Sequence, residues 1–173
     1  TMEIKPKLLF KKNYLAMVEN TAKGENWMFR NFYIEKNGAE TDALEEGKIS
    51  CAVLVSSILY LQNSSLEFLK KPNWINFVHA NVPSTTEDML SCGWYEIKEL
   101  RLGAVIVWEP RLGKDDNLTH QHNGFCVSET EAISNDSKGT GFPLRHDIHH
   151  PSSIDLNSRK IEKIYWHSDL DEY

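Results

Sequence analysis

The sequence predicts an α+β fold, with helices in the first half of the chain and short strands in the second. The longest apolar stretch, residues 51–62, exceeds the length of a typical strand and therefore favours a buried helix. After Gly93, short apolar segments alternate with turn-rich loops, which is typical of an antiparallel meander. A chain of 173 residues fits one core, so we expect a single domain over residues 1–173.

The first two helices are expected over residues 13–22 and 51–62. Asn13 is a suitable cap for the first, an amphipathic segment that ends before Gly24. Ser50 is a suitable cap for the second, which is apolar on nearly every face. A buried strand is the alternative for this second segment, because it contains β-branched residues.

A third helix is expected over residues 83–92, ending at Gly93. Its start shows capping-box spacing twice, at Ser84 with Glu87 and at Thr85 with Asp88. Between the first and second helices, "MFRNFYI" is expected to be an extended aromatic segment, and "EKNGAETDALEEG" a polar loop with an Asn-Gly turn. Strands are expected at residues 103–109, 123–127, 131–134 and 159–166.

The formal net charge of −6 disfavours nucleic acid as a partner, because a phosphate-binding surface needs clustered Lys and Arg. The longest apolar run is too short to span a bilayer, so we expect no membrane span. No segment resembles a signal peptide. We therefore expect a cytoplasmic location, or export if a leader lies outside this sequence.

The three cysteines, Cys51, Cys92 and Cys126, favour neither a disulfide framework nor a cysteine-rich zinc site, because their number is odd and no C-x-x-C pair occurs. Cys92 and Cys126 are read as structural. Cys51 would occupy the first turn of the second helix, where unpaired backbone N–H groups and the helix dipole favour a thiolate. The alternative for Cys51 is a small core residue.

His122 is the best candidate base, because it immediately precedes a small apolar strand in "THQHNGFCV". His120 is the alternative. A third polar group should orient the imidazole. The next strand returns antiparallel, and its far end carries Ser134 and Asn135 beside His122. We choose Asn135, whose amide oxygen accepts from an imidazole N–H without adding a charge; Ser134 and His146 remain alternatives.

Four segments in order, "SCAVLVSSIL", "STTEDMLSCGWYEI", "LGAVIVWE" and "HNGFCVSETEAISN", resemble the NlpC-type and CHAP papain-like cysteine peptidases. The resemblance extends over roughly residues 45 to 140. Departures are Ser50, where NlpC-type members usually have Asp, and Gly103-Ala104 in place of Gly-Asp. An ungapped match puts the third site residue at Ser134, whereas the Asn or Glu of CHAP members suits Asn135.

The resemblance implies a papain-like fold, with N-terminal helices on an antiparallel sheet, and hydrolysis of an amide bond through Cys51, His122 and a polar third residue. It implies no cofactor. Many members cut peptides of bacterial cell walls, so a peptide or peptidoglycan-like substrate is expected. Trp108 and Tyr33 are candidate substrate-binding walls, with Trp94 a further one; each of the three also suits a core.

Two other functions stay open. "RHDIHH" brings His146, His149 and His150 beside Asp147, a composition that could bind zinc, although we expect no metal site because His146 and His149 would face opposite sides of a strand. The same fold could also serve as a binding module that has lost its catalytic residues.

Overall fold

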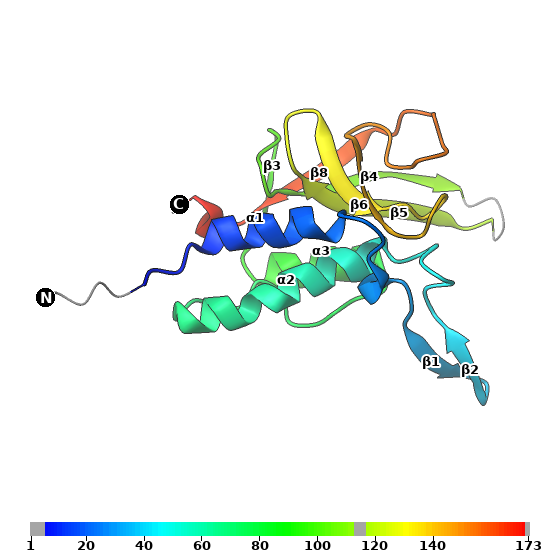
Figure 1. Cartoon of the computed structure of the whole chain (residues 1–173), viewed down its shortest axis with the longest axis horizontal. Helices are drawn as coiled ribbons and strands as arrows, with labels where there is room; N and C mark the ends of the chain where they lie inside the picture. The colour runs from blue at the N-terminus through cyan, green and yellow to red at the C-terminus, as the bar shows by residue number, and fades with distance from the viewer. Residues whose placement is uncertain (1–5, 113–116, 172–173) are drawn as a thin grey trace, which may run out of the picture.

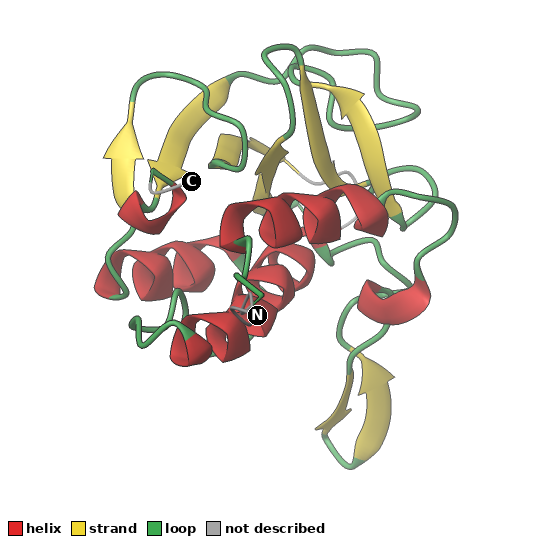
Figure 2. Cartoon of the chain, turned by 60° about the vertical axis from the view of Figure 1, so that its left-hand side comes forward, coloured by secondary structure: helices red, strands yellow, loops and turns green. Residues whose placement is uncertain are grey.

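A computed structural model describes residues 6–112 and 117–171 of the chain, and the prediction of an α+β fold is confirmed. Helices lie together on one side of a twisted antiparallel sheet, and a two-stranded hairpin projects from one end (Figures 1 and 2). The helices are α1 (Phe10–Thr21), α2 (Cys51–Phe68) and α3 (Val82–Ser91), with short 3-10 turns at Trp27–Phe29 and Ser168–Leu170.

The large sheet has the strand order β3-β8-β4-β5-β6-β7, and each neighbouring pair is antiparallel. Strands β4, β5 and β6 form an antiparallel meander as expected, and β7 continues it. The strand expected at residues 159–166, β8, does not follow β6 in the sheet but pairs with β4 and β3. The strands are β3 (Tyr95–Ile97), β4 (Val105–Leu112), β5 (Thr119–Cys126), β6 (Glu131–Asn135), β7 (Pro143–Asp147) and β8 (Ile161–Trp166).

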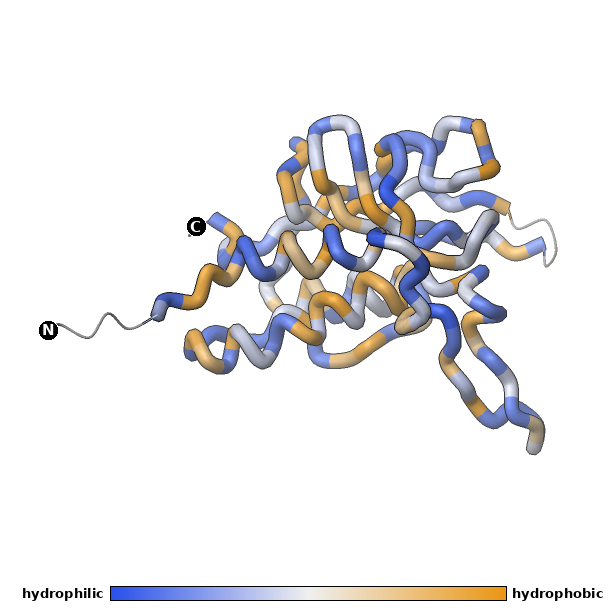
Figure 3. The backbone as a smooth tube through the Cα atoms, viewed as in Figure 1, coloured by the Kyte–Doolittle hydropathy of each residue, from blue (hydrophilic) through white to orange (hydrophobic). Residues whose placement is uncertain are grey.

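Helix α2 begins at Cys51, as the sequence predicts, and continues to Phe68. Its first five residues are all buried, which explains their apolar composition (Figure 3 shows hydrophobic residues along α2). Ser50 occupies the N-cap position, but its hydroxyl donates to the Gly47 carbonyl oxygen at 3.0 Å and makes no cap hydrogen bond to the helix. Within the described residues, no helix is both long and apolar enough to cross a membrane.

The caps expected for the other two helices are wrong. Helix α1 begins at Phe10, so Asn13 lies inside it; the buried Phe10 and Tyr14 carry its start into the core. Helix α3 is capped by Asn81, whose side-chain oxygen accepts from the backbone N–H of Ser84 at 2.8 Å. The helix therefore starts before the capping-box spacings, although it ends at Gly93 as expected, where φ is 97°.

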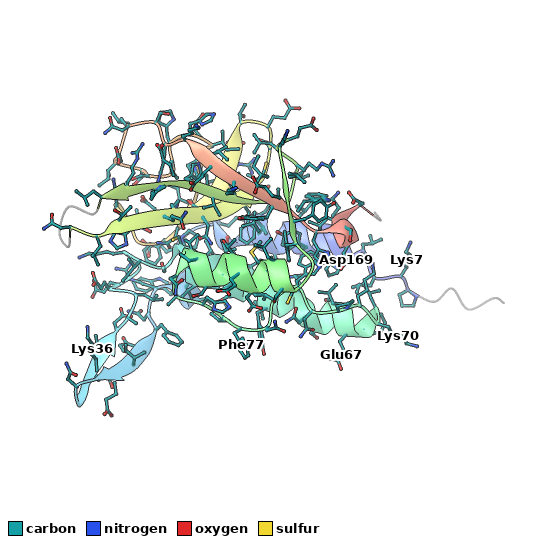
Figure 4. All side chains as sticks on the ribbon, turned by 180° about the vertical axis from the view of Figure 1, so that it is seen from behind. Lys7, Lys36, Glu67, Lys70, Phe77 and Asp169 are labelled. Carbon is teal, nitrogen blue, oxygen red and sulfur yellow. The ribbon has the colours of Figure 1, made fainter. Side chains whose placement is uncertain are left out.

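Four strands were not among those expected: two in a hairpin around Asn37-Gly38, the short β3 after α3, and β7. The polar segment around Asn37-Gly38 forms a hairpin of β1 (Tyr33–Lys36) and β2 (Ala39–Asp42), because both turn residues take the positive φ of a tight turn. Lys36 marks the far end of this hairpin, and Asp169 lies at the opposite end of the molecule (Figure 4). Strand β7, another of the four, contains His146.

The core beneath the sheet is centred on Trp74, which is fully buried. Its ring meets Phe10 at 4.9 Å, Tyr14 at 5.1 Å and Trp94 at 5.2 Å between centroids, each edge to face. The indole N–H of Trp74 donates to the Asp169 carboxylate at 3.0 Å, so this large polar aromatic is both packed and satisfied.

The loop that precedes Cys51 is locked against the turn between β6 and β7. A Cβ added at Gly47, where φ is 91°, would lie 2.1 Å from the carbonyl oxygen of Gly141. Only glycine fits this contact and this backbone conformation. The close approach fixes where α2 begins, and therefore where Cys51 stands relative to the sheet.

We predict that Gly47→Ala lowers the free energy of unfolding by more than about 3 kcal/mol, because the new methyl group strains φ and meets backbone. Gly38→Ala is the matched control: φ is 77° there, but nothing lies within 4 Å of the added Cβ. That variant should lose only about 1 kcal/mol. Urea denaturation measures both, and equal losses would contradict a locked junction.

Candidate active site

Cys51 and His122 line one cavity of about 860 Å³, which opens at the N-terminal end of α2. Its walls come from that helix end, the start of α3, strand β5 and the loops after β6 and β7. A smaller hollow of about 350 Å³ lies between α3 and the sheet, and neither cysteine nor histidine lines it. The larger cavity is therefore the candidate active site.

Cys51 is 8% exposed, and its sulfur lies close to the backbone N–H groups of Ala52 and Asn123. Burial raises the pKa of the Cys51 thiol, and the N–H groups and the positive charge of Arg159 offset this only in part. The expectation that the helix N-terminus leaves a thiolate at rest is therefore wrong. Loss of hydration outweighs the favourable dipole, and the resting group is a neutral thiol.

His122 is 4% exposed and pairs with Trp108 of β4 in the sheet register. Two residues later on the same face, Gly124 pairs with Ser134 of β6. A Cβ at Gly124 would lie 2.7 Å from the Cβ of Ser134, so the glycine leaves this face open. The imidazole of His122 can therefore reach across to the hydroxyl of Ser134.

A chain of hydrogen bonds joins three strands across this face. The Nε2 atom of His122 lies 2.7 Å from the Ser134 hydroxyl oxygen, which lies 2.8 Å from Nε2 of His146 on β7. The Nδ1 atom of His146 lies 2.7 Å from the backbone carbonyl oxygen of Asp147. Trp108 packs on both imidazoles, with centroids 5.3 and 5.8 Å away.

The chain of hydrogen bonds fixes where each proton sits. The Asp147 carbonyl only accepts, so Nδ1 of His146 carries a proton and donates it. Burial lowers the pKa of His146, so its ring is neutral and Nε2 accepts from the Ser134 hydroxyl. The Ser134 oxygen then accepts from Nε2–H of His122, which leaves Nδ1 of His122 as the unprotonated nitrogen.

This Nδ1 has no hydrogen-bond partner within the described residues. Among the described residues, the side-chain nitrogen and oxygen atoms that are fully enclosed and lack a hydrogen-bond partner are the Oδ1 atoms of Asn123 and Asn135. Since Nδ1 of His122 also lacks a partner but is not one of these atoms, it is not fully enclosed. Because His122 lines the cavity, its free lone pair is available to a reacting group there. Burial, and next the charge of Arg159, hold the pKa of His122 well below its usual value.

Within the described residues the side chain of Asn135 makes no hydrogen bond to His122, so its expected role as the orienting residue is wrong. Successive residues of a strand face opposite sides, and Ser134 is the one that faces the imidazole. The side-chain nitrogen of Asn135 instead donates to the Gly47 carbonyl oxygen at 2.5 Å. Asn135 therefore ties β6 to the loop before Cys51, and it positions the cysteine rather than the histidine.

The two proposed substrate-binding walls also lie elsewhere. Trp108 is fully buried, and its indole N–H donates to the Ile148 carbonyl oxygen at 2.7 Å, so it supports the imidazoles from behind. Tyr33 is 64% exposed on the projecting hairpin and is not among the cavity-lining residues. Trp94, the further candidate, packs in the core against Trp74.

The histidine-rich segment is divided among separate contacts. His146 belongs to the chain through Ser134, and His150 lies 2.9 Å from the carboxylate of Asp147. Among the described residues, no group of three or more His, Cys, Asp or Glu side chains is arranged to hold a metal ion. His120, the alternative base, lines the cavity from the same strand as His122.

Sequence reasoning missed Arg159, which lines the cavity and comes within two residues of β8. A single arginine at the start of an expected strand gives no signal by itself. Its proximity to Cys51 follows only from the return of β8 beside β4, a pairing between segments far apart in the chain.

We compared the chain with models of protein families, with curated proteins and with solved structures, and none of the three comparisons gave a match. The function must therefore be argued from the site itself.

We predict that the protein loses stability as the pH falls from about 7 to about 5, because the lowered pKa values of His122 and His146 keep both rings neutral when folded. Below the unfolded-state pKa of about 6.5, the unfolded chain binds protons that the folded chain excludes. Each such ring contributes a slope of up to about 1.4 kcal/mol per pH unit.

His122→Gln should make the loss at about pH 5 smaller by about 2 kcal/mol, measured by urea denaturation across the pH range. His149→Gln is the control, because His149 is exposed and outside the chain of hydrogen bonds. An unchanged pH dependence in His122→Gln would mean that His122 is not a buried neutral ring.

Proposed function

We propose that this protein is a cysteine hydrolase of the papain-like superfamily that cleaves an amide bond in a peptide. Cys51 acts as the nucleophile, His122 as the general base and acid, and Ser134 orients the imidazole. One observation carries the proposal: a cysteine at the start of a helix and a histidine with a free ring nitrogen line the same cavity.

The fold agrees with the resemblance to NlpC-type and CHAP peptidases at the level of its parts. The candidate nucleophile opens a helix that packs on an antiparallel sheet, and the candidate base lies on a strand of that sheet. The polar partner of the base comes from the next strand, as the resemblance implies. Peptides of the bacterial cell-wall kind are the substrate class that this resemblance suggests.

The reaction begins from a neutral pair. The Cys51 sulfur attacks the amide carbonyl carbon while its proton moves to Nδ1 of His122, so neither charge exists before the substrate excludes water. The imidazolium that forms keeps its Nε2–H hydrogen bond to Ser134. His122 then protonates the leaving amine, and water activated by the same nitrogen hydrolyses the thioester and restores the thiol.

The oxyanion of the tetrahedral intermediate requires hydrogen-bond donors at the same end of α2. The first backbone N–H groups of a helix have no partner within the helix, so those of Cys51 and Ala52 are suitable. The helix dipole adds to their effect because its positive end faces the cavity. The same features that fail to ionise the thiol at rest can thus stabilise charge that develops on the substrate.

Acylation by p-nitrophenyl acetate tests the proposal without knowledge of the substrate. We expect rapid formation of an acetyl thioester on Cys51, detected by peptide mapping, and no such adduct in Cys51→Ala. His122→Gln should slow acylation about 100-fold or more, because the thiol loses its base. Ser134→Ala should slow it about tenfold, since one orienting hydrogen bond is worth about 1.4 kcal/mol.

Cys92→Ala is the matched control, because Cys92 lies away from the cavity at the end of α3, and it should leave acylation of Cys51 unchanged. If Cys51 reacts no faster in the folded protein than in the unfolded chain, the hydrolase proposal is wrong. A folded protein with an inert Cys51 would instead fit the rival function, a binding module on the same fold.

A further inference from the structure

We propose that Arg159 forms a carboxylate-binding subsite beside Cys51, so that the substrate carries a free carboxylate close to the amide bond that is cleaved. The inference depends on the proposed function only in that the ligand is called a substrate. The subsite itself rests on the position of Arg159, on its hydrogen bonds and on the charges that line the cavity.

The guanidinium of Arg159 is held firmly by the backbone. Its Nε donates to the Glu109 carbonyl oxygen at 2.7 Å, and one terminal nitrogen donates to the His120 carbonyl oxygen at 2.7 Å. Arg159 is only 8% exposed, yet it lines the cavity together with Cys51. Two fixed hydrogen bonds orient the planar group and leave further N–H donors for a ligand.

Arg159 forms no ion pair within the described part of the chain. The two carboxylates near enough to act on it electrostatically are those of Glu109 and Asp155. Glu109 lies 3.6 Å from Arg111, and Asp155 lies 2.6 Å from Lys138 and 3.5 Å from Arg111. Both carboxylates are therefore already paired with cations other than Arg159.

A buried cation without its own anion is costly in a folded protein, and a bound anion removes that cost. Burial and the nearby charge of Arg111 lower the pKa of Arg159, which indicates that the guanidinium is poorly solvated and poorly neutralised. An arginine at the wall of a cavity, with its fork of donors fixed, matches the planar geometry of a carboxylate.

The charge of the whole cavity agrees with an anionic ligand. The chain carries a formal net charge of −6, but the ionisable side chains that line the cavity include four cations against two carboxylates. The cations are Lys48, Arg111, Lys138 and Arg159, and the carboxylates are Glu45 and Asp155. Such a cavity attracts anions and repels cations in an otherwise acidic protein.

The ligand is therefore a peptide carboxylate, either at a C-terminus or on an acidic side chain. Arg159 and Cys51 line the same cavity, so a carboxylate bound to Arg159 would share that cavity with the carbonyl that the sulfur attacks. A substrate in which an amide replaces the carboxylate should bind less tightly, because Arg159 then stays uncompensated.

Competition between two alkylating agents of similar size tests the subsite at the sulfur itself. Iodoacetate carries a carboxylate and iodoacetamide does not, and both react with the thiolate of Cys51 by displacing iodide. The ratio of their rates cancels any difference in thiolate fraction. We expect this ratio, measured at Cys51 by peptide mapping, to exceed that of the unfolded chain by about tenfold or more.

Arg159→Gln should reduce the ratio to within about twofold of the unfolded value, and Arg159→Lys should retain part of the preference. Arg101→Gln is the control, because Arg101 pairs with Asp171 on the surface and does not line the cavity. If Arg159→Gln does not fold, the comparison of wild-type folded and unfolded chains decides by itself. A wild-type ratio equal to that of the unfolded chain overturns the proposal.

A binding experiment separates this inference from the hydrolase proposal. N-acetylglycine and the α-amide of N-acetylglutamate offer a terminal and a side-chain carboxylate, and N-acetylglycinamide offers neither. We expect one of the two acids, but not the neutral amide, to shift the backbone amide signals of Ala52 and Asn123. No difference between acids and amide overturns the subsite. Selective binding beside an inert Cys51 supports the subsite and overturns only the hydrolase.

Discussion

The backbone carbonyl of Asp147 is the fixed point on which the proton arrangement of the site depends. A carbonyl can only accept, so the ring of His146 must present its N–H there and accept at its other nitrogen. The hydroxyl of Ser134 therefore donates to His146 and accepts from Nε2–H of His122, which leaves Nδ1 of His122 unprotonated. The Asp147 carbonyl on the edge strand β7 thereby determines which ring nitrogen of His122, two strands away on β5, carries a proton.

Burial decides the resting charge of the same site. The sulfur of Cys51 and the ring of His122 are both nearly inaccessible to water, and burial shifts the pKa of each toward its neutral form. An ion pair at rest would have to overcome this loss of hydration. In the mechanism that we propose, a neutral pair transfers its proton during attack and avoids that cost, and the helix N-terminus acts on the transition state.

The fold class, the start of α2 at Cys51 and the strands β4, β5, β6 and β8 could be predicted from local patterns, because hydrophobic periodicity and turn residues are local signals. The residue of β6 that faces His122 could be narrowed to Ser134 or Asn135 by alternation, but only the strand register decides between the two. The role of Arg159 could not be predicted, since it depends on a strand that returns from far along the chain.

The contacts of Gly47 and Asn135 were equally hidden from the sequence. Both residues join the loop before Cys51 to β6 and the turn that follows it, so the proposed nucleophile is positioned by the sheet as well as by its own helix. A polar residue beside a histidine in a strand pair is a tempting third catalytic group. Here that residue, Asn135, instead binds the loop before Cys51, which only the three-dimensional arrangement reveals.

Nuclear magnetic resonance of the histidine ring nitrogens shows which nitrogen of each ring carries a proton. At neutral pH we expect His122 to carry its proton on Nε2 and His146 to carry its proton on Nδ1, with both rings neutral. Long-range correlation of ring protons with ¹⁵N distinguishes these forms. A proton on Nδ1 of His122, or a doubly protonated ring at this pH, would rule out this arrangement, because Nδ1 of His122 could then not serve as the proposed base.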